Sequence, residues 1–250
     1  MTDTLEDLRR RNAELVEAVN ARDSFLAIAV HELRNPMTPI VGQVEMLLQA
    51  ARSAEGITSQ RLIQGLEKLA MAVRHFQNRA GTLLDVSRLN AGMLRLDVED
   101  MDLSALVREI IESYAAAAQY AKSPIEASIA DGIHGAFDAL AIRQIIDNVL
   151  GNAIRYSIGK PIEVSLTSDG TAARVRVQDH GVGISREDQA RIFERFERVV
   201  GASAGGFGIG LWVVRQLVEV MGGTITVSST PGKGSTFMIM LPLQSTQDRR

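Results

Sequence analysis

The stretch ALAIRQIIDNVLGNAIRYS, residues 139–157, indicates the architecture of the second half of the chain. Its apolar residues recur at helical spacing, and Asp138 stands where a helix N-cap is expected. The residues that form the apolar face are Ile145, Ile146, Val149, Leu150 and Ala153. Asn148 and Asn152 lie four residues apart, so they share a separate polar face of the same helix.

This polar face carries groups suited to a phosphate ligand. Amide oxygens are hard ligands of the kind that Mg²⁺ takes when it also bridges to phosphate oxygens. Arg155, with its forked guanidinium, and Tyr156 extend the face by one turn. Two exposed asparagines on an ordinary amphipathic helix are also common, so the helix alone leaves both interpretations open.

Alternating apolar and polar runs on both sides of this helix predict strands. The predicted strands are 125–130, 162–167, 173–178, 224–228 and 236–241, and further helices are predicted at 103–120 and 209–221. Turns are predicted at Ser168–Gly170 and Pro231–Gly234. Strands mixed with helices in one compact segment favour an α/β sandwich, in which helices cover one face of a single sheet.

Two glycine-containing segments follow this pattern. In DHGVG, residues 179–183, Asp179 ends a predicted strand and can accept a hydrogen bond from an exocyclic amine such as that of adenine, although a plain turn explains it equally. GGFGIGL, residues 205–211, leads into a helix, whose N-terminal N–H groups suit a phosphate. It follows no strand, so it is not a Rossmann dinucleotide-binding motif, and it lacks the Gly-Lys-Ser/Thr end of a P-loop.

The segment before this loop is small and flexible in composition. Residues 199–206 are therefore interpreted as a lid that closes over a ligand. Phe193 and Phe196 either fix the lid to the domain or belong to the ordinary core.

The first 95 residues have a helical pattern instead. A seam at heptad spacing runs through Leu5, Leu8, Asn12, Leu15, Val19, Arg22 and Leu26. We expect a dimeric coiled coil over 1–20, although one amphipathic helix on its own core would give the same pattern. Two helices, the second over 59–90, then form a hairpin with a turn at 50–59. One hairpin leaves a wide apolar stripe, which two chains would bury in a four-helix bundle, so a homodimer is predicted.

The first helix of this hairpin contains FLAIAVHELRNPMTPI, residues 25–40. His31 falls off the apolar seam, and Pro36 should bend the helix just after it. A neutral imidazole can act as a nucleophile, and Glu32 beside it can accept or orient a proton. A surface histidine in a proline-kinked helix is the simpler interpretation of this segment by itself.

Composition excludes several classes of protein. The 250 residues include 46% apolar and 23% charged residues, the mixture of a globular protein. A net charge of −3 gives no basic excess for nucleic acid or an anionic membrane. No cysteine is present, so disulfides and thiolate metal sites are excluded. No apolar run reaches membrane-spanning length, and the N-terminus is not a signal peptide. We expect a cytoplasmic protein, or the cytoplasmic portion of a longer, membrane-tethered one.

Taken together and in this order, six segments resemble the sensor histidine kinases of two-component systems. They are HELRNP (31–36), DNVLGNAIRYS (147–157), DHGVGI (179–184), IFERFERV (192–199), GGFGIGL (205–211) and TPGKGSTF (230–237). The resemblance covers about residues 20–243. It implies a coiled-coil signalling linker (1–20), a dimerisation and histidine-phosphotransfer hairpin (21–95) and a Bergerat-type ATP-binding domain (96–250).

The resemblance also implies roles for single residues. His31 would be the phospho-acceptor, Glu32 would assist its deprotonation, and Asn35 would orient water for dephosphorylation of a response regulator. ATP and Mg²⁺ would be the cofactors, with Asn148 and Asn152 on the metal. The remaining nucleotide-site residues would be Arg155 near the phosphates, Tyr156, Asp179 on adenine, and Gly181, Gly183, Gly206, Gly208, Gly210 and Leu211 around the lid and pocket.

The chain departs from the family pattern in a few places. Phe207 stands where a small or hydroxyl residue is usual, the lid is short, and Asn35 replaces the commoner threonine. Three alternatives stay open. The first is a phosphatase-dominant or kinase-inactive regulator of the same fold. The second is another Bergerat-type ATPase, such as a chaperone, topoisomerase or mismatch-repair module, and the third is a non-enzymatic dimeric scaffold.

Overall fold

The computed structural model describes residues 10–12, 16, 30, 33–34, 36–53, 57–90, 96–157, 159–195, 197 and 208–244. The chain divides into two compact units, Met1–Leu83 and Leu84–Arg250. Within the described residues, no helix combines the length and apolarity that crossing a membrane requires.

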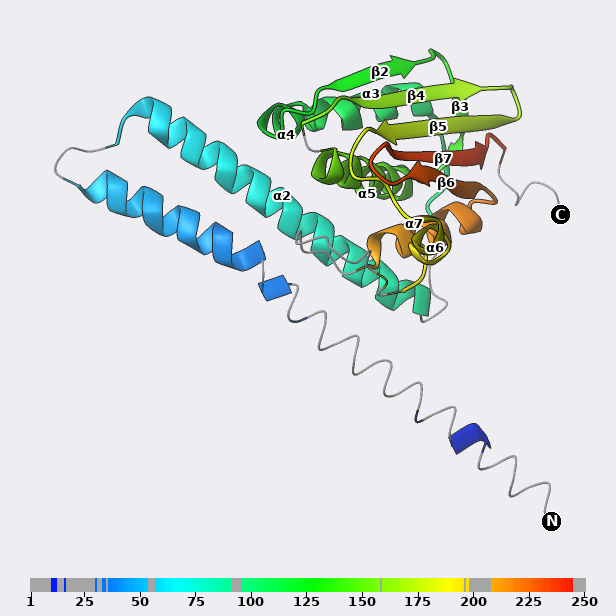
Figure 1. Cartoon of the computed structure of the whole chain (residues 1–250), viewed down its shortest axis with the longest axis horizontal. Helices are drawn as coiled ribbons and strands as arrows, with labels where there is room; N and C mark the ends of the chain where they lie inside the picture. The colour runs from blue at the N-terminus through cyan, green and yellow to red at the C-terminus, as the bar shows by residue number, and fades with distance from the viewer. Residues whose placement is uncertain are drawn as a thin grey trace. The chain divides into compact units, whose positions relative to one another are not determined.

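The first unit is helical (Figure 1). Residues 36–52 form one helix, and α2 spans Ser59–Asn90, as the apolar periodicity predicts. The two helices approach closely, because a Cβ added to Gly65 would overlap the Leu47 side chain. A row of apolar side chains still faces solvent in the single chain: Met37, Val41, Val44, Leu62, Ile63 and Leu66. This exposed row is the surface that the prediction of a homodimer rests on.

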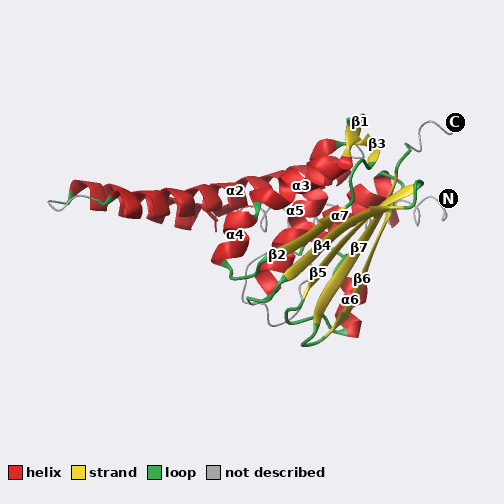
Figure 2. Ribbon diagram, turned by 90° about the horizontal axis from the view of Figure 1, so that it is seen from above, coloured by secondary structure: helices red, strands yellow, loops and turns green. Residues whose placement is uncertain are grey.

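The second unit contains a five-stranded sheet (Figure 2). Its strands are β2 (Ile125–Ile129), β4 (Ile162–Ser168), β5 (Ala172–Asp179), β6 (Thr224–Thr230) and β7 (Gly234–Pro242). They lie in the order β2-β4-β5-β7-β6. Only the β2–β4 pair is parallel, and the other three pairs are antiparallel.

Helices cover one face of this sheet. They are α3 (Leu103–Ser113), α5 (Ala139–Tyr156) and α7 (Gly210–Val220), accompanied by the short α4 (Ala115–Tyr120) and α6 (Arg186–Arg191). Side chains along β5 alternate between buried and half-buried, which is the pattern of a strand with one core face. The core is formed by Val107, Ile145, Val149, Val175, Val213 and Ile239, all at most 2% exposed. The predicted α/β architecture behind a helical N-terminal region is confirmed.

Two of the predicted elements were wrong in detail. The helix expected over 103–120 is interrupted at Tyr114, which separates α3 from α4. Its N–H donates to the carbonyl of Ile111, three residues earlier, at 3.0 Å, in place of the i−4 bond of a continuous α-helix. The Tyr114 hydroxyl donates to the carbonyl oxygen of Asp147 on α5 at 3.3 Å. This tertiary contact holds Tyr114 at the point where the helix is interrupted, although the apolar periodicity predicted a continuous helix there.

The segment 91–101 is also more than a linker. Its last residues begin β1 (Glu99–Asp102), which pairs antiparallel with β3 (His134–Phe137) in a separate two-stranded sheet. Neither strand was predicted, nor was α6. Both strands are four residues long, too short to show a clear alternation.

Asp138 caps α5 as predicted and also binds the incoming chain. Its Oδ1 accepts from the N–H of Ala141 at 2.9 Å, and its Oδ2 accepts from the N–H of Asp97 at 2.8 Å. One buried carboxylate thus fixes both the start of α5 and the segment that enters the domain.

Candidate functional site

The polar face of α5 meets the start of α7. The Asn148 amide nitrogen donates to the carbonyl of Gln144 at 2.8 Å, which leaves its Oδ1 directed at α7. A Cβ added to Gly210, the first residue of α7, would lie 2.5 Å from that Oδ1. Asn152 and Tyr156 are half-buried further along the same helix, and Arg155 is exposed. The structure therefore places an amide oxygen beside a helix N-terminus.

The N-terminus of α7 suits an anion. Ile209 occupies the N-cap position and makes no side-chain capping bond, so the first N–H groups of the helix are not satisfied by a cap. Gly208 precedes it with φ of +64°, a conformation that a side chain would strain. Leu211 follows, half-buried, in the first turn. Gly206 and Phe207 lie outside the described residues.

Asp179 ends β5 as a buried carboxylate with 5% of its surface exposed. Its Oδ1 accepts from the N–H of Gly181 at 2.8 Å, and the backbone N–H and hydroxyl of Ser235 also donate to it. Burial raises the pKa of Asp179, against the effect of these hydrogen bonds. An ionised carboxylate offers about four lone-pair sites, so it retains capacity for one more donor, such as an amine.

Ser235 is a site residue that the sequence analysis missed. It lies in the TPGKGSTF segment that was noted only for its turn, and β7 begins at Gly234, two residues earlier than predicted. The hydroxyl of Ser229 supports it from β6: it donates to the Gly234 carbonyl at 2.8 Å and lies 3.1 Å from the Ser235 hydroxyl. A hydroxyl directly after Gly234, at the end of the predicted turn, was the available signal.

Gly181 and Gly183 are required by close backbone approaches. A Cβ on Gly181 would overlap the carbonyl oxygen of Tyr156 at the end of α5. Gly183 has φ of +68°, and a Cβ there would overlap the carbonyl oxygen of Thr230. The loop that follows Asp179 thus lies directly against the C-terminal end of α5. Asp179 and Tyr156 therefore mark one end of the site, and Asn148 with Gly210 marks the other.

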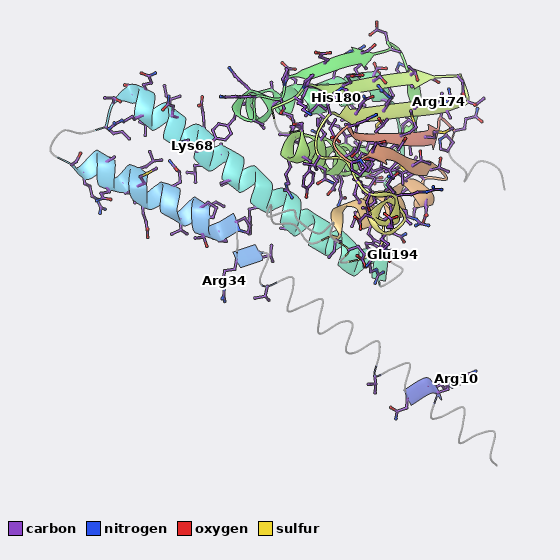
Figure 3. The ribbon with its side chains drawn as sticks, viewed as in Figure 1. Arg10, Arg34, Lys68, Arg174, His180 and Glu194 are labelled. Atoms are coloured by element: carbon purple, nitrogen blue, oxygen red, sulfur yellow. The ribbon has the colours of Figure 1, made fainter. Side chains whose placement is uncertain are left out.

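The opposite face of the sheet carries a separate polar cluster. His180 Nε2 lies 2.9 Å from Glu163 Oε1, and Arg176 lies 3.3 Å from Oε2 of the same carboxylate. These hydrogen bonds lower the pKa of Glu163. Arg174 and His180 lie toward opposite ends of β5 (Figure 3). Because side chains alternate along a strand, His180 points away from the face that carries Asp179.

The predicted phosphotransfer residues His31, Glu32 and Asn35 lie outside the described residues. Their neighbours Leu33 and Arg34 are helical, as are residues 36–52. Of the two residues expected to contact a lid, the structure describes one. Phe193 is 9% exposed and belongs to the core, whereas Phe196 is outside the described residues.

The donor set of the second unit fits a magnesium–nucleotide complex. Asn148 and Asn152 supply amide oxygens, and Mg²⁺ is usually held by one or two protein oxygens together with substrate phosphates. The uncapped start of α7 supplies N–H groups for those phosphates. The buried Asp179 supplies an acceptor for a base amine at the far end of α5.

Comparisons with known proteins agree with this arrangement. A family model described as "His Kinase A (phospho-acceptor) domain" matches residues 21–92. A second, described as "Histidine kinase-, DNA gyrase B-, and HSP90-like ATPase", matches residues 137–245. Between them, the two matches cover the hairpin and the nucleotide-site residues.

Individual proteins give the same result. "Circadian input-output histidine kinase CikA" of Synechococcus elongatus is 30% identical over 261 residues, which cover 98% of this chain and 34% of CikA. "Sensor-like histidine kinase SenX3" of Mycobacterium tuberculosis is 31% identical over 226 residues, which cover 89% of this chain and 54% of SenX3. The chain thus spans about a third to a half of the length of these curated relatives. The solved structure of Acinetobacter baumannii histidine kinase AdeS has the same fold, with a TM-score of 0.58 and 24% identity over 85% of this chain and 98% of that one.

Proposed function

Because the chain belongs to the sensor histidine kinase family, we propose that it uses ATP to phosphorylate its own His31 and then transfers the phosphoryl group to an aspartate of a response regulator. The observation that carries this proposal is the juxtaposition in the second unit. Asn148 Oδ1 lies at the uncapped start of α7, and the buried Asp179 lies at the other end of α5. The phospho-acceptor match over 21–92 favours this function over other ATPases with a similar nucleotide domain.

In this proposal the chain has three parts. Residues 1–20 form a coiled-coil signalling linker, 21–95 form the dimerisation and phosphotransfer hairpin, and 96–250 form the ATP-binding domain. The exposed apolar row on the hairpin supports a homodimer, because a second copy would remove that row from water. A response regulator would approach the hairpin near His31. We propose that the reaction takes place in the cytoplasm, where ATP is available.

The nucleotide-binding residues act by positioning. Asp179 accepts a hydrogen bond from the adenine amine, while Gly181 and Gly183 let the backbone pass close to the base. The N–H groups of Gly210 and Leu211, together with Arg155, contact the phosphates, and Tyr156 lines the nucleotide. Gly206 and Gly208 frame the lid. Asn148 and Asn152 would hold Mg²⁺, which neutralises charge on the phosphates when it is bound.

The chemical step forms a phosphorus–nitrogen bond. A ring nitrogen of neutral His31 attacks the γ-phosphorus of ATP, the bond between that phosphorus and the β–γ bridging oxygen breaks, and ADP leaves. The proton on the other ring nitrogen passes to Glu32. In the second step, the phosphoryl group moves from His31 to an aspartate oxygen of the regulator, and the histidine regains its proton.

We extend the proposal to dephosphorylation of the same regulator. Asn35 lies four residues after His31, so a helix would place its amide one turn away on the same side. An amide there can orient a water molecule toward the phosphorylated aspartate. Loss of regulator dephosphorylation in Asn35→Ala, with autophosphorylation kept, is the expected result.

The test of the kinase proposal is transfer of label from ATP labelled at its γ-phosphate. Wild-type protein and His31→Gln are compared with Mg²⁺ present, and nucleotide binding is measured for both. We expect an acid-labile, alkali-stable label on the wild type and none on the variant. Label on both proteins would reject His31 as the acceptor. Absence of both label and nucleotide binding in the wild type would leave only a non-enzymatic scaffold.

A further inference from the structure

Gln144 carries a buried amide nitrogen that lacks a hydrogen-bond partner. Among the described residues, Gln144 Nε2 is the one buried side-chain nitrogen or oxygen atom without a hydrogen-bond partner. Its backbone carbonyl is occupied, because it accepts from Asn148 Nδ2 at 2.8 Å. A buried donor without an acceptor is unfavourable, and such a group in a native fold calls for an explanation.

The position of Gln144 on α5 suggests what the missing acceptor is. Gln144, Asn148 and Asn152 follow one another at intervals of four residues, so all three lie on one face of the helix. The adenine end of the site is at Tyr156, against which Gly181 packs. Asn148 lies beside the start of α7, about 12 Å from Tyr156 along the helix axis, and Gln144 lies about 6 Å further in the same direction.

A nucleotide that begins at Asp179 and passes the start of α7 therefore has its last phosphate nearest to Gln144. Building on the proposed function, we propose that Gln144 binds the terminal phosphoryl group of ATP through its side-chain amide. The amide nitrogen can supply two N–H donors and carries no charge. It would recognise the γ-phosphoryl oxygens without holding ADP after transfer.

The expected effect is selective for the third phosphate. A hydrogen bond to a charged group contributes enough that its loss weakens binding by about 10- to 100-fold. ADP has no atom at this position, so its affinity should stay within about twofold of wild type. The apo protein should be no less stable after Gln144→Met, because the substitution removes an unpaired buried polar group.

The experiment measures the affinity of the full chain for ADP and for a non-hydrolysable ATP analogue, each with saturating Mg²⁺. Wild type, Gln144→Met and Gln144→Glu are compared, together with the rate of His31 labelling and the apo Tm. Gln216→Met is the matched control, since Gln216 lies on α7 and its amide donates to Glu219 at 3.2 Å. We expect both Gln144 variants to bind the analogue at least about tenfold more weakly, to bind ADP as wild type does and to label His31 more slowly. The carboxylate of Gln144→Glu should have the larger effect, because it repels phosphate.

Two results would overturn the inference. Analogue binding equal to wild type in Gln144→Met, with a raised Tm, would show that the amide is only a structural defect. Equal weakening of ADP and analogue would show that Gln144 supports the pocket as a whole. If the methionine variant does not fold, the same comparison on Gln144→Glu decides, since that residue has the same size. If the wild type takes no label, the proposed function fails, but the ADP-to-analogue comparison still tests Gln144.

Discussion

Substituting Gly210 by alanine should weaken magnesium-dependent nucleotide binding while leaving the fold intact. The added Cβ would lie 2.5 Å from Asn148 Oδ1 and 3.4 Å from its Cγ. Gly210 does not have a positive φ, and it is the first residue of α7, so alanine fits the backbone there. The clash is with a side chain, which can rotate. The substitution therefore acts on the position of Asn148 rather than on the helix.

The expected loss of affinity can be estimated from the interactions that Asn148 loses. Rotation breaks its hydrogen bond to the Gln144 carbonyl, which contributes about 1 kcal/mol. Holding the side chain near its original position instead costs about 1 kcal/mol of rotamer strain. Either response costs about 1 kcal/mol, which corresponds to about a fivefold weaker affinity for nucleotide with Mg²⁺.

The assay is calorimetric titration of ADP with Mg²⁺ and with a chelator in its place. A double-mutant cycle isolates the clash: in the Asn148→Ala background, Gly210→Ala should have almost no further effect, because the atom that it displaces is gone. Gly151→Ala is the control on α5, where a Cβ would meet the Tyr114 hydroxyl oxygen at an ordinary 3.9 Å. Equal losses from Gly210→Ala in both backgrounds would refute the assigned contact between α7 and Asn148.

Two further predictions concern single carboxylates. Burial raises the pKa of Asp179, so its carboxylate becomes protonated at a higher pH than that of an exposed aspartate. Nucleotide affinity should therefore fall as the pH falls through that raised pKa. In the same calorimetric titrations, Asp179→Asn should bind nucleotide weakly and lose this pH dependence. The stability of the nucleotide-free protein should change with pH in the opposite direction. The folded state binds the proton of Asp179 more tightly than the unfolded state does, so the stability that this proton contributes is lost as the pH rises through the folded pKa. Asp138→Ala should lower the free energy of unfolding by about 1–2 kcal/mol, because the N–H groups of Ala141 and Asp97 lose their acceptor. Urea denaturation measures this change, and an unchanged denaturation midpoint would contradict the prediction.

Long elements with clear periodicity could be predicted from the sequence. The apolar face of α5 and its cap at Asp138 set the register of the helix, so the shared face of Asn148 and Asn152 followed without a structure. The alternation in β4 and β5 likewise placed Asp179 at a strand end. These features are local, and each is determined by residues within a few turns or one strand.

Features that depend on contacts between distant segments could not be predicted. The break at Tyr114 depends on Asp147, 33 residues later. Strands β1 and β3 exist because they pair with each other across about 30 residues, not because either has a strong pattern. The donation from Ser235 to Asp179 and the approach of Gly210 to Asn148 are also created by packing. No periodicity in the sequence signals such contacts.

In the proposed reaction His31 receives the phosphoryl group from ATP, and mass spectrometry of the phosphorylated chain can locate that group. The protein is incubated with ATP and Mg²⁺, digested at neutral to alkaline pH, and each peptide is examined before and after brief acid treatment. We expect one added phosphoryl group on the peptide that contains His31, lost in acid and absent from His31→Gln. A phosphoryl group on any other peptide, or one that persists in acid, would contradict it.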